Sequence, residues 1–484
     1  MPSSRVDVVD GVDMVDGVDA EPAASHPYNL ASPWPDIIFM ALGAKTGTMK
    51  NLVTPCPGVA MHPLKQRARE LATQDYRSAP SVREAILALT NYDESQVPPY
   101  TLPSPLQTAD GKTIATANEW MNFQRPAILN LFKKEMYGQM PPRPDQMAFE
   151  ILTERNDALD NTAIRQEIRI HCSMRNGRSH SFDMLLYRPK NAPEPAPAFL
   201  GLCFKGNHAT TDETDVRMTG QRLGKPELLT EDTRGIQAER WSFRELVKRG
   251  YAGATICYHD IFPDHAGGWD QSIFALFEDL DGFNGAHPKY SSIGGWAWGL
   301  SRGLDCLEHI PGIDPTRIAL HGHSRLGKTS LWAGACDQRF RIVISNDSGC
   351  GGATLARRFF GETYLFIVNA MPHWFVKSFR QYIANEDAMP FDQHFLIALS
   401  APRPVVVASA AEDLWADPKG EFLSAQNAGA VYALFGSKGL EADAMPALDE
   451  YVTGDVSYHV RTGKHDQTWV DWQHYLKIAD RYLV

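Results

Sequence analysis

The stretch RIALHGHSRLGKTSLWAGAC at residues 317–336 decides the fold that this chain is expected to adopt. Its apolar residues 318–320 predict a short buried strand, and its last seven residues, which are small and apolar, predict a helix. Between them the chain is expected to turn sharply at Ser324, with Gly322 and Gly327 where strand and helix approach closely. This is the layout of a nucleophile elbow, in which the helix start directs backbone N–H groups toward an anion forming at the serine.

The match of this turn to the G-x-S-x-G pattern is imperfect, because Leu326 occupies the last glycine position. The alternative interpretation is a glycine-flanked serine in an ordinary strand–helix loop. The flanking strand and helix favour the elbow, and so do candidate partners of the serine farther along the chain.

The composition of the chain limits the classes of protein to which it can belong. The chain has 484 residues, of which 43% are hydrophobic, and a net charge of −11. It can bury a large core, and its negative charge implies no general affinity for nucleic acid. It contains no run of about 18 apolar residues, so no membrane span is expected. The seven cysteines form no C-x-x-C pair and are typical of buried thiols rather than of a metal site.

Three regions are predicted along the chain. Residues 1–60 are expected to form a disordered or loosely packed tail, and they contain five Val-Asp repeats but no pattern of a signal peptide. Residues 61–110 predict a helical lead-in and linker. Residues 111–484 predict the catalytic domain.

The periodicity within the catalytic domain favours an α/β-hydrolase fold, with a mostly parallel central sheet flanked by helices. An antiparallel hairpin comes first, and strands then alternate with helices. Strands are expected at residues 168–172, 182–187, 198–204, 252–257, 318–320, 342–345, 404–409 and 456–460, and helices at 118–139, 242–248, 296–309 and 469–482.

Two insertions follow strands of this predicted sheet, at residues 209–240 and 351–400. Loops at the carboxyl ends of parallel strands normally form the ligand cleft, so both insertions are expected to form the cleft here.

A catalytic serine needs a base and a group that orients the base. His465 lies between the last predicted strand and the last helix, which is the usual position of the histidine in this fold. Two acids compete as its partner: Asp413 follows the strand at 404–409, and Asp347 follows the strand at 342–345. Asp413 occupies the usual position of the triad acid, and Asp347 is retained as the alternative acid.

Two cations, Arg325 and Lys328, stand at the start of the helix that follows Ser324. Cations are electrostatically unfavourable at a helix N-terminus, so their presence suggests that they bind an anion. Arg325 is a candidate contributor to an oxyanion hole, and Lys328 a candidate ligand of substrate oxygens. Two exposed charges without a function are the alternative.

The heptapeptide Gly-His-Ser-Arg-Leu-Gly-Lys at 322–328 resembles the G-x-S-R-x-G-K signature of glucuronoyl esterases, carbohydrate esterase family 15. Further stretches support a resemblance to the bacterial type across residues 110–484: KGNH at 205–208, GGWAWGLSRGLD at 294–305, NDSGCGG at 346–352, DQH at 392–394, APRP at 401–404 and EDLWADP at 412–418.

The resemblance implies an α/β-hydrolase that needs no metal or cofactor. It implies cleavage of esters between (4-O-methyl-)glucuronic acid on xylan and lignin alcohols, and a secreted or periplasmic location. A monomer is expected. The resemblance also implies that Ser324 is the nucleophile, His465 the base and Arg325 the oxyanion contributor. Lys328, Glu362 and Trp415 correspond to the residues that contact the sugar.

The sequence departs from the fungal members of this family. They have a cysteine just before the serine and another just after the histidine, where this chain has His323 and Asp466. Their acid is a glutamate at the position of Asp347, whereas bacterial relatives often use the position of Asp413. Another carbohydrate esterase of the same fold, such as an acetyl-xylan esterase, is the alternative function.

Overall fold

The computed structural model describes residues 61–76, 79–191, 195–220 and 230–484. The tail expected at 1–60, and residues 221–229 of the first insertion, lie outside the described residues.

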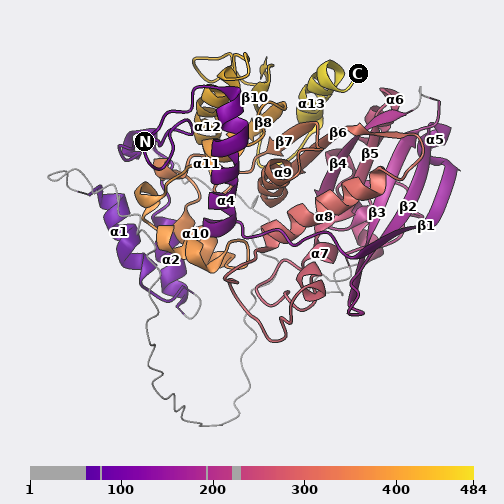
Figure 1. Cartoon of the computed structure of the whole chain (residues 1–484), viewed down its shortest axis with the longest axis horizontal. Helices are drawn as coiled ribbons and strands as arrows, with labels where there is room; N and C mark the ends of the chain where they lie inside the picture. The colour runs from indigo at the N-terminus through magenta and orange to yellow at the C-terminus, as the bar shows by residue number, and fades with distance from the viewer. Residues whose placement is uncertain (1–60, 77–78, 192–194, 221–229) are drawn as a thin grey trace, which may run out of the picture. The chain divides into compact units, whose positions relative to one another are not determined.

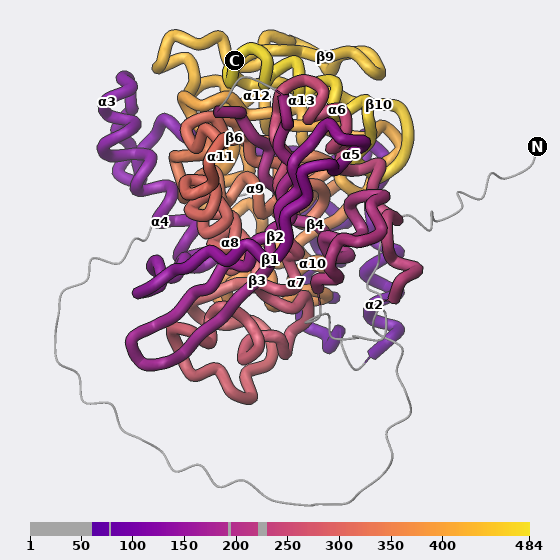
Figure 2. The backbone as a smooth tube through the Cα atoms, turned by 90° about the vertical axis from the view of Figure 1, so that its right-hand side faces the viewer, coloured from indigo at the N-terminus to yellow at the C-terminus, as the bar shows by residue number. Residues whose placement is uncertain are grey.

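A ten-stranded mixed sheet runs through the described part of the chain, in the order β1-β2-β3-β5-β4-β6-β7-β8-β10-β9. Its first three strands are antiparallel and run side by side in Figure 2: β1 (Gln146–Asp157), β2 (Ala163–Ser173) and β3 (Ser179–Pro189). The central strands are parallel: β5 (Ala252–Cys257), β4 (Ala196–Cys203), β6 (Ile313–His323), β7 (Ile342–Asn346), β8 (Val405–Ala410) and β10 (Val456–Arg461). The short β9 (Tyr451–Val452) pairs antiparallel with β10 at the far edge.

Alternate residues of the parallel strands face two separate hydrophobic clusters, so both faces of the sheet are buried. On β7, Val343 belongs to one cluster, while Ile342 and Ile344 belong to the other. On β4, Leu200 and Phe199 divide in the same way. This explains why these strands appear in the sequence as continuous apolar runs.

Helices cover both faces of this sheet. The first face packs against α8 (Ser292–Leu307), which crosses the sheet in Figure 1, α9 (Arg325–Cys336) and α12 (Pro418–Ala433). The second face packs against α6 (Phe243–Lys248) and α13 (Trp469–Tyr482). This three-layer arrangement agrees with the predicted α/β-hydrolase fold. None of the helices in the described ranges is long and apolar enough to cross a membrane.

The lead-in contains α1 (Pro63–Ala72) and α2 (Pro80–Ala88), which lie beside α10 (Tyr364–Ala370) of the second insertion (Figure 1). Lys65 pairs with Asp387 at 2.6 Å, and Arg69 Nε donates to the carbonyl of Ala384 at 3.0 Å. His394, at the start of α11 (Gln393–Ala398), bonds to the Pro103 carbonyl at 3.0 Å. The lead-in therefore packs along the second insertion.

The helix expected at 118–139 and the strand β1 differ from the sequence prediction, and the helix α12 was not predicted. The helix expected at 118–139 is divided into α3 (Ala117–Glu119), a π-helical turn and α4 (Arg125–Glu135). It ends early because Gly138 adopts a left-handed φ of 78° and two prolines follow at 141 and 142. Strand β1 was not predicted, because its residues are mostly polar and its sides are largely exposed.

The contact between α9 and β7 generates a prediction for stability. A Cβ on Gly334 would lie 2.4 Å from Cγ2 of the buried Val343, so we expect Gly334→Ala to lower the free energy of unfolding by about 1–3 kcal/mol. Gly429 of α12 is the matched control, because a Cβ there would meet its nearest neighbour at an ordinary 3.5 Å. Gly429→Ala should gain about 0.5–1 kcal/mol from helix propensity. Urea denaturation of both variants would measure these opposite shifts, and equal shifts would contradict the prediction.

Candidate active site

Ser324 forms the turn between β6 and α9, and its backbone is strained. Its φ of 57° and ψ of −129° lie in a region that non-glycine residues rarely adopt. Its N–H donates to the carbonyl of Asn346 on β7 at 2.9 Å. A Cβ on Gly322 would lie 2.1 Å from the Leu326 carbonyl oxygen, so no larger residue fits there. The turn has the shape that the nucleophile-elbow prediction requires.

The imperfect glycine pattern has a structural explanation. Helix α9 begins at Arg325, five residues earlier than predicted, and Leu326 packs into the core with 1% of its surface exposed. The close approach falls on Gly327 instead, where a Cβ would lie 3.0 Å from the Asn346 carbonyl oxygen. Leucine is therefore tolerated at the position where the usual motif has its last glycine.

His465 and Asp413 are hydrogen-bonded to each other. The Nδ1 of His465 lies 2.6 Å from Oδ2 of Asp413, and the histidine comes from the loop after β10 and the acid from the loop after β8. Asp413 is buried, whereas the His465 side chain is 22% exposed. The His465 ring also packs against the ring of His323, directly before Ser324, with centroids 4.5 Å apart. This contact brings the histidine to the serine turn.

Asp347 lies near the same histidine. One side-chain atom each from Asp347, Asp413 and His465 lie within 4.8 Å of one another. Burial raises the pKa of Asp347 well above its ordinary value, and the nearby charge of Asp413 raises it further. Such a spacing also suits a metal ion, but Nδ1 of His465 is already used by Asp413, and a carboxyl with a raised pKa is a poor ligand. The arrangement therefore fits a hydrogen-bonded acid–base pair.

Arg325 is held in place by Asp264, a residue that the sequence analysis missed. Arg325 Nη1 donates to Asp264 Oδ2 at 2.6 Å, and the guanidinium lies 5.0 Å from the ring centroid of Trp374. Asp264 also accepts bonds from His373 Nε2 at 2.8 Å and Trp374 Nε1 at 2.7 Å. Although burial acts to raise the pKa of Asp264, Arg325 and His373 hold it well below its ordinary value. The carboxylate explains how a cation is tolerated at the start of α9.

The residues that are predicted to contact the sugar lie near Arg325. Lys328 is buried, with Nζ 5.6 Å from the centroid of Trp374, and burial lowers its pKa. Glu362 and Trp415 are half-buried and neighbouring, because the N–H of Glu362 donates to the Trp415 carbonyl at 2.8 Å. Burial raises the pKa of Glu362 to about 7, and the charges of Lys328 and Arg325 oppose that rise.

Arg461, the last residue of β10, is a second residue that the sequence analysis missed. It is buried, and it donates to the carbonyls of Thr462 at 3.2 Å and Lys464 at 2.8 Å, and also to that of Asp466. These three carbonyls surround His465 in the chain. The guanidinium therefore holds the loop that carries the histidine.

The same guanidinium connects this loop to two buried acids. Arg461 Nε donates to Asp471 Oδ2 at 2.8 Å, and Nη2 lies 3.4 Å from Asp347 Oδ2.

A usable signal existed for Asp264, which follows the end of β5, because loops at the carboxyl ends of parallel strands form the sites of such sheets. Arg461 had the same kind of signal, because it ends the parallel strand β10 and stands just before the loop that carries His465.

Comparison with known proteins finds close relatives. A family model described as glucuronyl esterase, fungi, matches residues 281–436. The carbohydrate esterase MZ0003 of an unknown prokaryotic organism is 43% identical over 401 residues, which cover 81% of this chain and 92% of that protein. The 4-O-methyl-glucuronoyl methylesterase of Schizophyllum commune is 24% identical, and the match covers 69% of this chain and 74% of that protein.

Solved structures agree with this result. A promiscuous esterase of carbohydrate esterase family 15, from a marine bacterial metagenome, has a TM-score of 0.73 at 42% identity. A glucuronoyl esterase from Solibacter usitatus has a TM-score of 0.74 at 39% identity. Each match covers 81% of this chain and all of the other.

The short bond to His465 predicts that the two acids contribute unequally. Asp413→Asn leaves the shape of the side chain but removes the charge that orients the histidine, so we expect kcat on a benzyl glucuronate ester to fall about 10²- to 10⁴-fold. Asp347→Asn is the matched control, because the pKa of this carboxyl is raised and the hydrogen bond of His465 found among the described residues goes to Asp413, so this variant should lose much less. Steady-state kinetics of the two variants measures this difference, and a larger loss in Asp347→Asn would contradict it.

The bonds of Arg461 predict an effect on kcat rather than on KM. Arg461→Lys keeps the charge but loses the fork that reaches the loop carbonyls, and misplacement of His465 should lower kcat by up to about 10²-fold. Arg403→Lys is the matched control: Arg403 is also buried and donates to the carbonyls of Phe340 at 2.9 Å and Gly334 at 2.6 Å.

Thermal melts of the two arginine variants would show whether they lose similar stability. A shifted pH profile of kcat/KM in Arg461→Lys alone would report the displaced histidine. Equal kinetic losses in both variants would mean that Arg461 contributes only stability.

Proposed function

The chain belongs to carbohydrate esterase family 15, the glucuronoyl esterases, and we propose that it hydrolyses esters of (4-O-methyl-)glucuronic acid through an acyl-enzyme on Ser324. The observation that best supports this is the 2.6 Å bond between His465 and Asp413 beside a strained serine turn. An oriented base next to a serine held clear of its strand is what nucleophilic ester cleavage requires.

In the proposed acylation, Ser324 Oγ attacks the ester carbonyl carbon while His465 Nε2 takes the hydroxyl proton. Asp413 keeps the proton on Nδ1 of His465 and stabilises the imidazolium that forms. The proton then passes to the alkoxide oxygen as the C–O bond to the alcohol breaks. Water attacks the acyl-enzyme with His465 again as base, and this step releases the uronic acid and regenerates Ser324.

Charge on the carbonyl oxygen develops at the start of α9. The backbone N–H of Arg325 and its guanidinium are the proposed donors, and Asp264 and Trp374 support the guanidinium in its position. Fixed donors in a site with little water stabilise the developing charge strongly, because they need no reorganisation.

The uronate ring is proposed to lie against Lys328, Glu362 and Trp415. Lys328 donates hydrogen bonds to sugar hydroxyls, and the Trp415 ring packs on a face of the sugar. Glu362, with a pKa raised to about 7, can accept from a hydroxyl when ionised and donate to one when protonated. An acetyl group would not need these three residues, so they favour a uronate over an acetylated sugar.

The proposed polymer substrate is glucuronoxylan esterified to lignin alcohols. Since such a polymer lies outside cells, we propose a secreted or periplasmic location. We also propose that the enzyme acts as a monomer.

The test is kcat/KM on benzyl glucuronate beside an aryl acetate, for the parent and for Ser324→Ala. We expect a strong preference for the glucuronate, and a loss of at least about 10³-fold in Ser324→Ala, because the nucleophile is absent. Lys328→Met should raise KM for the glucuronate and leave the acetate nearly unchanged. A parent that prefers the acetate would instead support an acetyl esterase on the same fold.

A further inference from the structure

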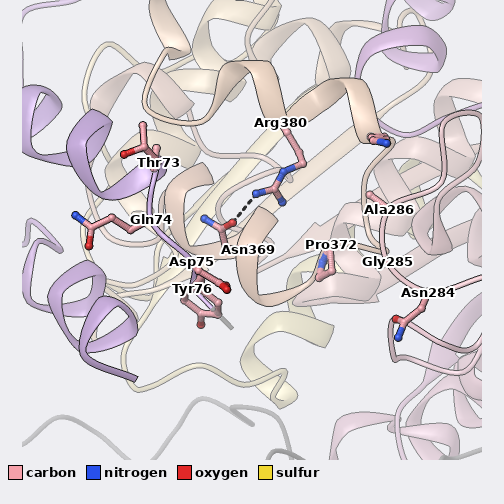
Figure 3. A pocket seen from close by; sticks show the side chains of 12 residues that line it. Thr73, Gln74, Asp75, Tyr76, Asn284, Gly285, Ala286, Asn369, Pro372 and Arg380 are labelled. Carbon is pink, nitrogen blue, oxygen red and sulfur yellow. Dashed lines mark hydrogen bonds between the residues drawn. The ribbon is translucent and has the colours of Figure 1, made fainter. Parts of the chain in front are cut away.

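A pocket of about 570 Å³ lies outside the active site described above, between the lead-in and the second insertion (Figure 3). Its volume falls within the range of about 300–1,000 Å³ that is usual for ligand pockets. The lining residues come from the end of α1 and the segment after it, from the loop at 284–286, and from the segment at 369–380. They carry mainly hydrogen-bonding groups, among them Gln74, Asp75, Tyr76, Asn369, Lys377 and Arg380.

The two sides of the pocket are fixed to each other by contacts that need no ligand. The ion pair of Lys65 with Asp387 and the bond of Arg69 to the Ala384 carbonyl attach α1 to the second insertion. On the opposite side, Arg380 Nη2 donates to Asn369 Oδ1 at 2.8 Å, the bond drawn in Figure 3. The pocket is therefore preformed, which lowers the entropic cost of binding.

The third wall is fixed as well. Trp269 Nε1 donates to the Gly285 carbonyl at 3.1 Å, and the N–H of Lys377 donates to the His287 carbonyl at 2.9 Å. The first bond attaches the loop at 284–286 to Trp269, and the second holds the residue that follows this loop against the segment at 369–380.

A series of aromatic contacts connects the pocket with the proposed uronate site. The ring of Tyr76 meets Phe366 edge-on with centroids 6.3 Å apart, and Phe366 meets Trp415 edge-on at 5.1 Å. Burial raises the pKa of Tyr76, Arg83 opposes the rise, and the charge of Glu362 adds to it. Tyr76 thus lies one ring away from the tryptophan and within electrostatic reach of the carboxyl that the proposed function assigns to the uronate.

We propose that this pocket is a second glycan subsite, which binds neutral sugar residues of the xylan chain that carries the esterified uronate. This inference rests on the proposed function and extends it from a uronate ester to an oligosaccharide. Amide and hydroxyl side chains suit sugar hydroxyls because they both donate and accept, and the half-buried Tyr76 ring offers a face to a sugar ring. Charges of both signs line the pocket, so a neutral sugar fits it better than a second acidic group.

The first experiment compares two substrates, benzyl glucuronate and the benzyl ester of glucuronic acid linked to xylotriose. The parent should show a lower KM for the longer substrate. Tyr76→Ala and Gln74→Ala should each reduce that advantage about threefold to tenfold, as expected for one lost contact or hydrogen bond. Gln66→Ala is the matched control, because Gln66 is also an exposed glutamine of the lead-in but does not line the pocket.

A parent without any preference for the longer substrate would overturn the subsite. So would Tyr76 and Gln74 variants that keep the full preference of the parent. The rate on benzyl glucuronate is the internal reference for the reaction centre in every variant.

A second experiment separates this inference from the proposed function. Unesterified xylotetraose is titrated calorimetrically into Ser324→Ala, alone and combined with Tyr76→Ala or with Gln66→Ala. Binding that Tyr76→Ala weakens at least threefold, and that Gln66→Ala leaves unchanged, would support the subsite even if benzyl glucuronate proved to be a poor substrate. Absence of binding to Ser324→Ala, or equal binding in all three proteins, would overturn the subsite while the esterase function remained.

Discussion

The close contact of β6 with α9 around Ser324 is the constraint on which the rest of the site depends. No side chain fits at Gly322. Farther along α9, the absence of a side chain at Gly334 allows the helix to lie against β7. Because the helix is pressed onto the sheet, the N–H of Ser324 reaches the carbonyl of Asn346 at the carboxyl end of the neighbouring strand. The loops after β7, β8 and β10 begin at this same edge, so Asp347, Asp413 and His465 meet at the serine turn although they are distant in sequence.

Burial of this edge makes charge pairing the second requirement. A buried charge is costly unless it is paired and hydrogen-bonded. Asp264 meets this requirement for Arg325, and Arg461 lies between Asp347 and Asp471. These pairs also fix geometry, since each guanidinium contacts both a carboxylate and another part of the site. The same groups that offset the cost of burial therefore also orient the residues that we propose to react.

The sequence predicted those features that depend on local pattern. Buried parallel strands, their order along the chain and the turn at Ser324 all leave a signal in composition and spacing. Strand β1 left none, because an edge strand with exposed polar sides lacks the apolar alternation of a buried one. The contacts that Asp264, Trp374 and Arg461 make with their neighbours in space also left no signal, because they join segments that are brought together only by the folded sheet. The choice between Asp413 and Asp347 was also left open, because it depends on a distance of 2.6 Å that spacing in the sequence does not encode.

The lead-in shows how far such non-local contacts extend. In sequence it appeared as a helical approach to the catalytic domain, yet the carbonyl of Asn91 accepts the N–H of Gly361 at 2.8 Å. Gly361 has no space for a side chain, because a Cβ would lie 2.4 Å from the carbonyl oxygen of Trp415. Glu362 follows directly and bonds to the same carbonyl, so the segment that presents it is held between the lead-in on one side and the Trp415 loop on the other. The position of the carboxyl that we assign to the uronate thus depends on residues that precede the first strand of the sheet. Substitutions in the lead-in would alter the position of this carboxyl through the bond to Gly361.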